Sequence, residues 1–144
     1  DPLWSRGLGD VYKRQEITRV LKNNGTFYCT TYSKYHMQEI SELAQNFDSR
    51  ISLSDDPLPE RFGLENGKDI LKSYFNYVEL KKYEDYLLIT EAQPLIDYIL
   101  SCHGNQNEYL GNRLKEFKIY IEDLIKESQG IKITKDSGLF ICTK

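Results

Sequence analysis

The stretch RVLKNNGTFYCTTYSKYHM, residues 19–37, decides the fold of this chain. It opens with the last residues of an amphipathic helix, and the Asn-Asn-Gly that follows tolerates the positive φ of a helix end and turn. Residues 26–31 are β-branched and aromatic, which predicts a mostly buried strand. Ser33 is a suitable N-cap for a second helix that extends to about Phe47. The stretch therefore predicts a helix–strand–helix unit of an α/β fold.

The rest of the chain continues this alternation after a long irregular segment at residues 48–67. Pro57 and Pro59 exclude a helix interior or a central strand there, and such long loops often cover a binding site. The later predicted elements are a short helix from Asn66 or Gly67 to Phe75, strand segments at 77–80 and 86–90 separated by a turn or bulge, helices at 94–101 and 110–128, and two strands or one hairpin at 131–134 and 139–143. This order predicts a layered parallel sheet whose last strand is antiparallel, because a tight turn at 136–138 leads into that strand.

The composition narrows the classes of function. The chain has 144 residues, a net charge of −3, 40% hydrophobic residues and 28% charged residues, which is typical of one soluble globular domain. No basic patch favours nucleic acid, and no apolar run approaches the roughly 20 residues that span a membrane. The three cysteines are too far apart for a zinc site and form no disulfide framework. These features predict a cytoplasmic protein with no metal, no membrane and no nucleic-acid partner.

Residues 1–15, DPLWSRGLGDVYKRQ, differ from the rest of the chain. They show no apolar periodicity and resemble the translation of a leftover sequencing adapter, so we treat them as an artefact. The alternative is a native disordered N-terminus. In either case the chain begins inside a helix at Glu16, which predicts a truncated gene whose structural domain is residues 16–144.

Four motifs then occur in a recognisable order. They are RVLKNNGTFYCTT at 19–31, FGLENG at 62–67, a strand at 83–90 that leads to a helix at 95–101, and GIKITK with GLFI at 130–141. Together they resemble the C-terminal portion of a bacterial branch of the class I S-adenosylmethionine-dependent methyltransferases. The first motif resembles the family's RVLKPGG turn before the fifth strand, although Asn23 and Asn24 depart from the commoner Pro-Gly. The resemblance implies the fifth to seventh strands of a Rossmann-like sheet, with their helices.

The family binds S-adenosylmethionine at the N-terminal half of its sheet, through a glycine-rich turn and an acidic residue. No G-x-G-x-G motif occurs in this sequence, so we assign no cofactor-binding residue. The resemblance implies that S-adenosylmethionine serves the intact protein only and that this chain alone is an inactive fragment. The fifth strand would then lack a neighbour, and we expect the isolated chain to self-associate through this exposed strand edge.

What remains is the acceptor side of the expected enzyme. In an open α/β sheet the ligand lies beyond the carboxyl ends of the strands. The candidate substrate-binding residues there are Thr31, Tyr32, Tyr35, His36, Glu65 and Asn66. The catalytic residue is unknown, and His36 is the one candidate for a general base because its titration range suits that task. First-turn surface and capping roles are the alternative interpretation of these residues.

Three functions compete. The first is methyl transfer to a small-molecule acceptor, and the second is a complete, non-catalytic α/β binding or interaction module. The third is methyl transfer to RNA or protein, and the acidic charge balance argues against RNA.

Overall fold

The structure is a computed structural model that describes residues 10–55 and 58–144. These residues fall into two compact units, each with its own hydrophobic core. Among the described residues, unit 1 comprises 10–36, 58–84 and 136–144, and unit 2 comprises 37–55 and 85–135.

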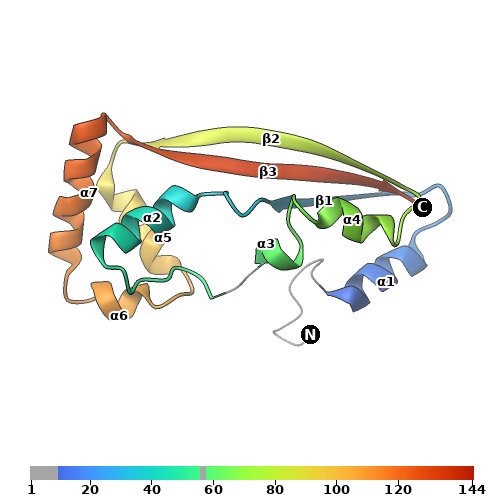
Figure 1. Cartoon of the computed structure of the whole chain (residues 1–144), viewed down its shortest axis with the longest axis horizontal. Coiled ribbons are helices and arrows are strands. Elements are labelled where there is room, and N and C mark those ends of the chain that lie inside the picture. Colours follow the sequence, from blue (N-terminus) through green and yellow to red (C-terminus); the bar gives the residue numbers. More distant parts are fainter. Residues whose placement is uncertain (1–9, 56–57) are drawn as a thin grey trace. The chain divides into compact units, whose positions relative to one another are not determined.

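The secondary structure is a mixture of short helices and three strands (Figure 1). The order along the chain is α1 (Val11–Val20), β1 (Thr26–Tyr32), α2 (Gln38–Phe47), α3 (Leu58–Arg61), α4 (Gly67–Lys72), β2 (Tyr77–Ile89), α5 (Ala92–Ser101), α6 (Gln106–Leu110), α7 (Leu114–Ser128) and β3 (Ile131–Thr143). The three strands form one open antiparallel sheet in the order β1-β3-β2, so β1 and β2 are its two edge strands. The α/β class predicted from the sequence is therefore confirmed.

Unit 1 is built on the pairing of β1 with the end of β3. The two strands are antiparallel, with Thr26 opposite Thr143 and Tyr32 opposite Ser137. This pairing confirms that the last strand is antiparallel. The core of unit 1 takes its buried residues from β3, the segment before α4, α4 itself, the connection after it and β2: Phe62, Leu64, Leu71, Phe75, Val78, Phe140 and Cys142. Phe140 is fully buried and contacts the Phe62 ring at a centroid distance of 5.8 Å, so these two rings join the segment to the sheet.

Unit 2 has a core in which helices supply most of the side chains. Helix α5 packs against both α6 and α7. The buried residues of this core include Leu95 and Ile99 from α5, and Phe117 and Ile121 from α7. The spacing of four residues in each pair places its two members on one face of the helix, which is why a helix with charged outer residues still buries an apolar stripe. Phe47 of α2 adds its ring 4.9 Å from Phe117.

The strands differ from the predicted ones in length and surroundings. The predicted turn at residues 136–138 is wrong, and the strand segments predicted at 77–80 and 86–90 are parts of one strand, because β2 and β3 each run unbroken for 13 residues. The predicted parallel sheet is also wrong for the described strands. Residue Tyr28 of β1 is 61% exposed, and exposed residues alternate with half-buried ones from Thr26 to Thr31, so the prediction of a mostly buried strand is wrong. The two faces explain the weak apolar alternation of its sequence.

The helices differ mainly at their starts. Helix α2 begins at Gln38, five residues after the predicted N-cap Ser33, because Met37 adopts a left-handed conformation with φ 56°. The helix predicted at 110–128 is α7, which begins at Leu114, because the separate helix α6 ends at Leu110. The predicted boundary at residue 16 falls inside α1, which residues 11–15 begin, while residues 1–9 lie outside the described part. Arg14 in that half of α1 is buried, with its guanidinium 5.6 Å from the Tyr74 ring centroid.

Candidate functional site

Six residues that the sequence singles out come together in unit 1, at the carboxyl end of β1. We call this set the strand-end cluster, and its members are Thr31, Tyr32, Tyr35, His36, Glu65 and Asn66. The segment before α4 is attached to the end of β1 by two hydrogen bonds. Thr31 Oγ1 donates to the carbonyl of Phe62 over 2.8 Å, and the amide of Leu64 donates to the carbonyl of Tyr32 over 3.3 Å. The FGLENG motif and the strand end therefore form one local structure.

Glu65 makes a third link between the two segments. Its Oε1 accepts a hydrogen bond of 3.1 Å from the backbone N–H of Lys34, while the side chain stays exposed. A carboxylate is the right group here, because it attracts the donor more strongly than a neutral acceptor does. Glu65 therefore holds the turn after β1, whether or not it also contacts a ligand.

Asn66 holds the short loop that precedes α4. Its Oδ1 accepts from the amide of Gly63 over 2.8 Å, and its Nδ2 donates to the carbonyl of Glu60 over 2.7 Å. Gly67 follows because a Cβ there would lie 2.7 Å from the ring of Phe140, which is too close for any larger residue without movement. The Asn-Gly pair of the motif is thus explained by loop closure and by packing.

Tyr32 and His36 stack on each other, with ring centroids 5.0 Å apart and ring planes 28° apart. The stack is fixed by the backbone of β3, since the amide of Asp136 donates to His36 Nδ1 over 3.0 Å and the carbonyl of Asp136 accepts from the Ser33 amide over 3.0 Å. A backbone N–H can only donate, so Nδ1 carries no proton and the neutral ring carries it on Nε2. A general-base role at Nδ1 would require this hydrogen bond to break.

Tyr35 is the most open aromatic residue of the cluster, at 50% exposure. Its amide donates to Ser33 Oγ over 3.1 Å, which forms a tight turn, and the ammonium of Lys34 lies 5.0 Å from its ring centroid. Ser33 itself is buried. This turn replaces the first helical turn that the sequence predicts, and it presents the phenol of Tyr35 to solvent.

Asp136 is the cluster's neighbour that sequence reasoning missed. Besides its two backbone contacts with His36 and Ser33, its Oδ1 is buried and accepts no hydrogen bond from the described residues. A buried carboxylate oxygen without a donor is unusual in native proteins. No local pattern could reveal it, because His36 and Asp136 are 100 residues apart.

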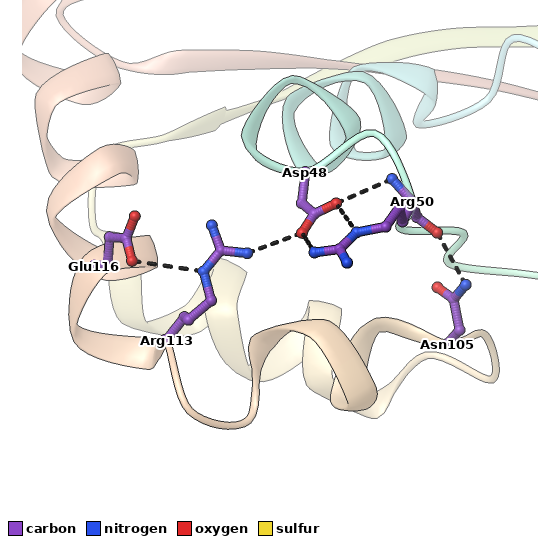
Figure 2. A network of polar contacts seen from close by, with 5 residues as sticks. All are labelled: Asp48, Arg50, Asn105, Arg113 and Glu116. Carbon is purple, nitrogen blue, oxygen red and sulfur yellow. Dashed lines mark hydrogen bonds and ion pairs between the residues drawn. The ribbon is translucent and has the colours of Figure 1, made fainter.

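A second polar group lies in unit 2 around Asp48, and Figure 2 shows it. The carboxylate receives hydrogen bonds from Arg50 Nε at 2.9 Å and Nη2 at 2.7 Å, and from Arg113 Nη1 at 2.8 Å. The side chain of Asp48 is only 8% exposed. The side chain of Arg50 donates the hydrogen bonds that do most to hold the pKa of Asp48 well below its usual range. The backbone amide of Arg50 and the side chain of Arg113 lower this pKa further.

The Asp48 group connects three segments of unit 2. Asn105 Nδ2 donates to the Arg50 carbonyl over 2.9 Å, and Arg113 Nε reaches Glu116 at 3.5 Å (Figure 2). The aromatic faces nearby are also occupied, since the Arg50 guanidinium lies 4.5 Å from the ring of Tyr109. With its oxygens paired in this way, Asp48 is a structural link between α2 and the residues around α6 and not a reactive carboxylate.

Unit 2 also has an open cleft of about 350 Å³ between the start of α5 and α7. Its lining residues are Thr90, Glu91, Ala92, Gln93, Lys118, Glu122, Ile125 and Lys126. None of the six residues of the strand-end cluster lines this cleft. It is therefore a separate feature from the strand-end cluster.

The described residues do not fit S-adenosylmethionine. Strand β1 is followed by residues 33–37, SKYHM, and β2 by Thr90 and Glu91, so neither leads into the glycine-rich turn that lets a nucleotide-like ligand approach the backbone. In residues 10–55 and 58–144, no three or more His, Cys, Asp or Glu side chains gather as a possible metal site. No helix in this part of the chain has the length and apolar character needed to cross a bilayer.

No protein-family model matches the chain, and a search of curated proteins finds no relative.

Proposed function

We propose that the strand-end cluster binds the acceptor of a methyl-transfer reaction, in a protein of which this chain forms the C-terminal portion. The acceptor is a small molecule. The observation that carries the proposal is the convergence of Thr31, Tyr32, Tyr35 and His36 with the Glu65 segment beyond the carboxyl end of β1. The resemblance to the methyltransferases implies that the acceptor lies beyond this end of the strand.

Methyl transfer requires these residues mainly to position the acceptor. Methyl transfer is an in-line displacement at carbon, so an acceptor held in the right orientation gains most of the available rate. The aromatic stack of Tyr32 and His36 offers a flat surface, and the half-exposed phenol of Tyr35 offers a hydrogen-bonding group beside it. These groups favour a methyl acceptor that has an aromatic or flat part and a polar group beside it.

The methyl donor implied by the resemblance is S-adenosylmethionine, and we assign no residue of this chain to it. Under this proposal the donor is held by a part of the protein outside this chain, and the chain alone binds none. Isothermal calorimetry of the chain with S-adenosylmethionine is expected to show no saturable heat. A stoichiometric binding curve would overturn this assignment of the two sites.

The first test is to sequence the DNA upstream of the codon for Glu16. An in-frame strand, glycine-rich turn and helix would support a methyltransferase, and the longer protein should then be assayed for methyl transfer to a panel of small molecules. A start codon near Glu16 would contradict the proposal.

In the longer protein, Tyr35→Ala is expected to raise the KM for the acceptor about tenfold, the scale of one lost hydrogen bond or stacking contact. The affinity for S-adenosylmethionine should stay unchanged, and an unaffected acceptor KM would contradict the placement of the site.

The second candidate is a non-catalytic binding or interaction module. The observation in its favour is the open sheet, in which both β1 and β2 are edge strands and β2 exposes the rings of Tyr77, Tyr83 and Tyr86. Exposed aromatic residues of this kind are enriched where proteins bind one another. A reading frame that begins near Glu16 would favour this candidate over the first.

A further inference from the structure

Strand β2 is an edge strand with an unusually long exposed stretch. All eight residues from Lys81 to Leu88 are exposed, and β2 has β3 as its neighbour on one side only in the described sheet. An exposed edge offers unpaired backbone N–H and C=O groups to another strand. Natural edges usually block such pairing with charged residues, so the order of the charges on this edge decides what can bind there.

The charges on this edge are arranged symmetrically about Tyr83. The sequence is Lys81-Lys82-Tyr83-Glu84-Asp85, with two cations before the tyrosine and two anions after it. These residues are consecutive in one strand, so their side chains alternate between its two faces: the odd-numbered positions lie on one face and the even-numbered positions on the other.

We propose that two copies of this chain pair through β2, antiparallel and in register about Tyr83. In this arrangement Lys81 lies opposite Asp85 of the second copy, Lys82 lies opposite Glu84, and Tyr83 lies opposite its own counterpart. Each opposed pair has side chains on the same face of the joined sheet, and each is a cation with an anion or a ring with a ring. Opposite charges and aromatic residues at facing positions stabilise antiparallel strands. The interface is isologous, as expected for a two-fold dimer.

The same charges exclude the neighbouring registers. A two-fold axis perpendicular to the sheet places one residue opposite itself, so the next possible centres are Lys82 and Glu84. Those registers put two cations or two anions face to face, which is unfavourable. In the register about Tyr83, Leu80 also lies opposite Tyr86, while Glu79 lies opposite Leu87 and adds nothing to the match. Strand β1 has no charged residue between Thr26 and Tyr32, so its edge offers no comparable selection of a partner or register.

A contact made by one strand from each copy is small, so we expect a monomer–dimer equilibrium that depends on concentration. Two variants test it by sedimentation equilibrium. Lys81→Glu/Lys82→Glu makes all four charges negative, and Glu84→Lys/Asp85→Lys makes all four positive. Each variant alone should dimerise at least roughly tenfold more weakly than the parent chain, because like charges then face each other at every charged position. An equimolar mixture should form heterodimers, since the charges become complementary again.

The control for net charge is Lys115→Glu/Lys118→Glu, which changes two exposed lysines of α7 by the same amount. It should leave dimerisation as it is in the parent chain. A parent chain that stays monomeric, charge variants that dimerise as the parent does, or a mixture that stays monomeric would each overturn the proposal.

A cross-linking experiment fixes the register. In Tyr83→Cys the two introduced thiols face each other at the centre, where opposed Cβ atoms are about 5 Å apart, and mild oxidation should join two chains. Lys82→Cys keeps the same native cysteines but places its thiol opposite Glu84, so cross-linking should be much slower. Equal cross-linking of the two variants would contradict the register about Tyr83. Circular dichroism checks that both variants are folded.

Discussion

The backbone amide of Asp136 donates a hydrogen bond to Nδ1 of His36 over 3.0 Å, although the two residues are 100 positions apart. This contact fixes the tautomer of the imidazole, because the N–H can only donate and Nδ1 must accept. We predict that neutral His36 carries its proton on Nε2. Nitrogen-15 NMR shifts of the two ring nitrogens measure this directly, with exposed His103 as the reference within the same chain. A spectrum in which Nδ1 of His36 carries the proton would contradict the geometry.

Thr31 and Thr30 form a matched pair for measuring the link between β1 and the segment before α4. Thr31 Oγ1 donates to the Phe62 carbonyl over 2.8 Å, whereas Thr30 is exposed. Thr31→Val keeps the shape and removes the donor, so it should lower the free energy of unfolding by about 1 kcal/mol. Thr30→Val should change it by less than about 0.5 kcal/mol, as is usual for surface substitutions. Chemical denaturation of both variants checks this, and equal effects would rule out a role for the hydrogen bond.

The Asp48 group should make stability depend on pH. Because the pKa of Asp48 is lowered in the folded chain, chiefly by its hydrogen bonds from Arg50, the carboxylate stabilises the fold at neutral pH. This contribution is complete above the unfolded value of about 3.9 and declines as the pH falls through the lower folded value. Asp48→Asn should therefore reduce the melting temperature by several degrees at pH 7. The difference from the parent chain should narrow below about pH 4, where the unfolded carboxyl binds its proton.

The control for this experiment is Asp123→Asn on α7, since Asp123 is exposed. The melting temperature of Asp123→Asn should equal that of the parent chain at pH 7 and at pH 3. If Asp48→Asn lost the same stability at pH 3 as at pH 7, the loss would come from packing and not from the charge.

The three thiols should differ in reactivity. Burial, with a smaller effect of the neighbouring thiol, raises the pKa of Cys29 to about 12, and burial raises that of Cys142 to about 11. Burial also raises the pKa of Cys102. Alkylation needs the thiolate, and at pH 8 a thiol with a pKa near 11 is ionised in roughly one molecule in a thousand. Iodoacetamide should therefore modify Cys102 before Cys29 and Cys142 in the folded chain. Peptide mapping by mass spectrometry measures the order, which should disappear in denaturant.

Strand β1 and the helices α4 and α5 could be predicted from sequence because their signals are local. The β-branched run at 26–31 forms a strand, and the apolar spacing of α5 forms a helix. The length of the two other strands could not be predicted. Asp136-Ser137-Gly138 is typical of a turn, yet in the structure a Cβ at Gly138 would lie 2.8 Å from Leu64 and 3.0 Å from Leu80. Gly138 is therefore required by the close packing of Leu64 and Leu80 against it and not by a turn, and this packing cannot be predicted from the sequence.

The candidate site could likewise be predicted only in the part whose residues are neighbours in the sequence. The sequence correctly places Thr31, Tyr32, Tyr35 and His36 at a strand end, because these residues are contiguous. It does not reveal that His36 meets Asp136, or that Arg113 reaches Asp48 across 65 positions. Contacts of this kind depend on how distant segments are brought together, and no periodicity or spacing in one sequence encodes them.

The two Asn-Gly pairs of this chain should age at different rates. Deamidation begins when the backbone nitrogen of the glycine attacks the side-chain carbon of the asparagine, and so it needs a side chain that is free to turn. At Asn66-Gly67 the carboxamide is held by hydrogen bonds at both of its polar atoms. Asn24 is exposed in a turn with φ 63°. Stored protein should therefore acquire its first new negative charge at Asn24, while the loop before α4 keeps its amide for as long as the fold persists.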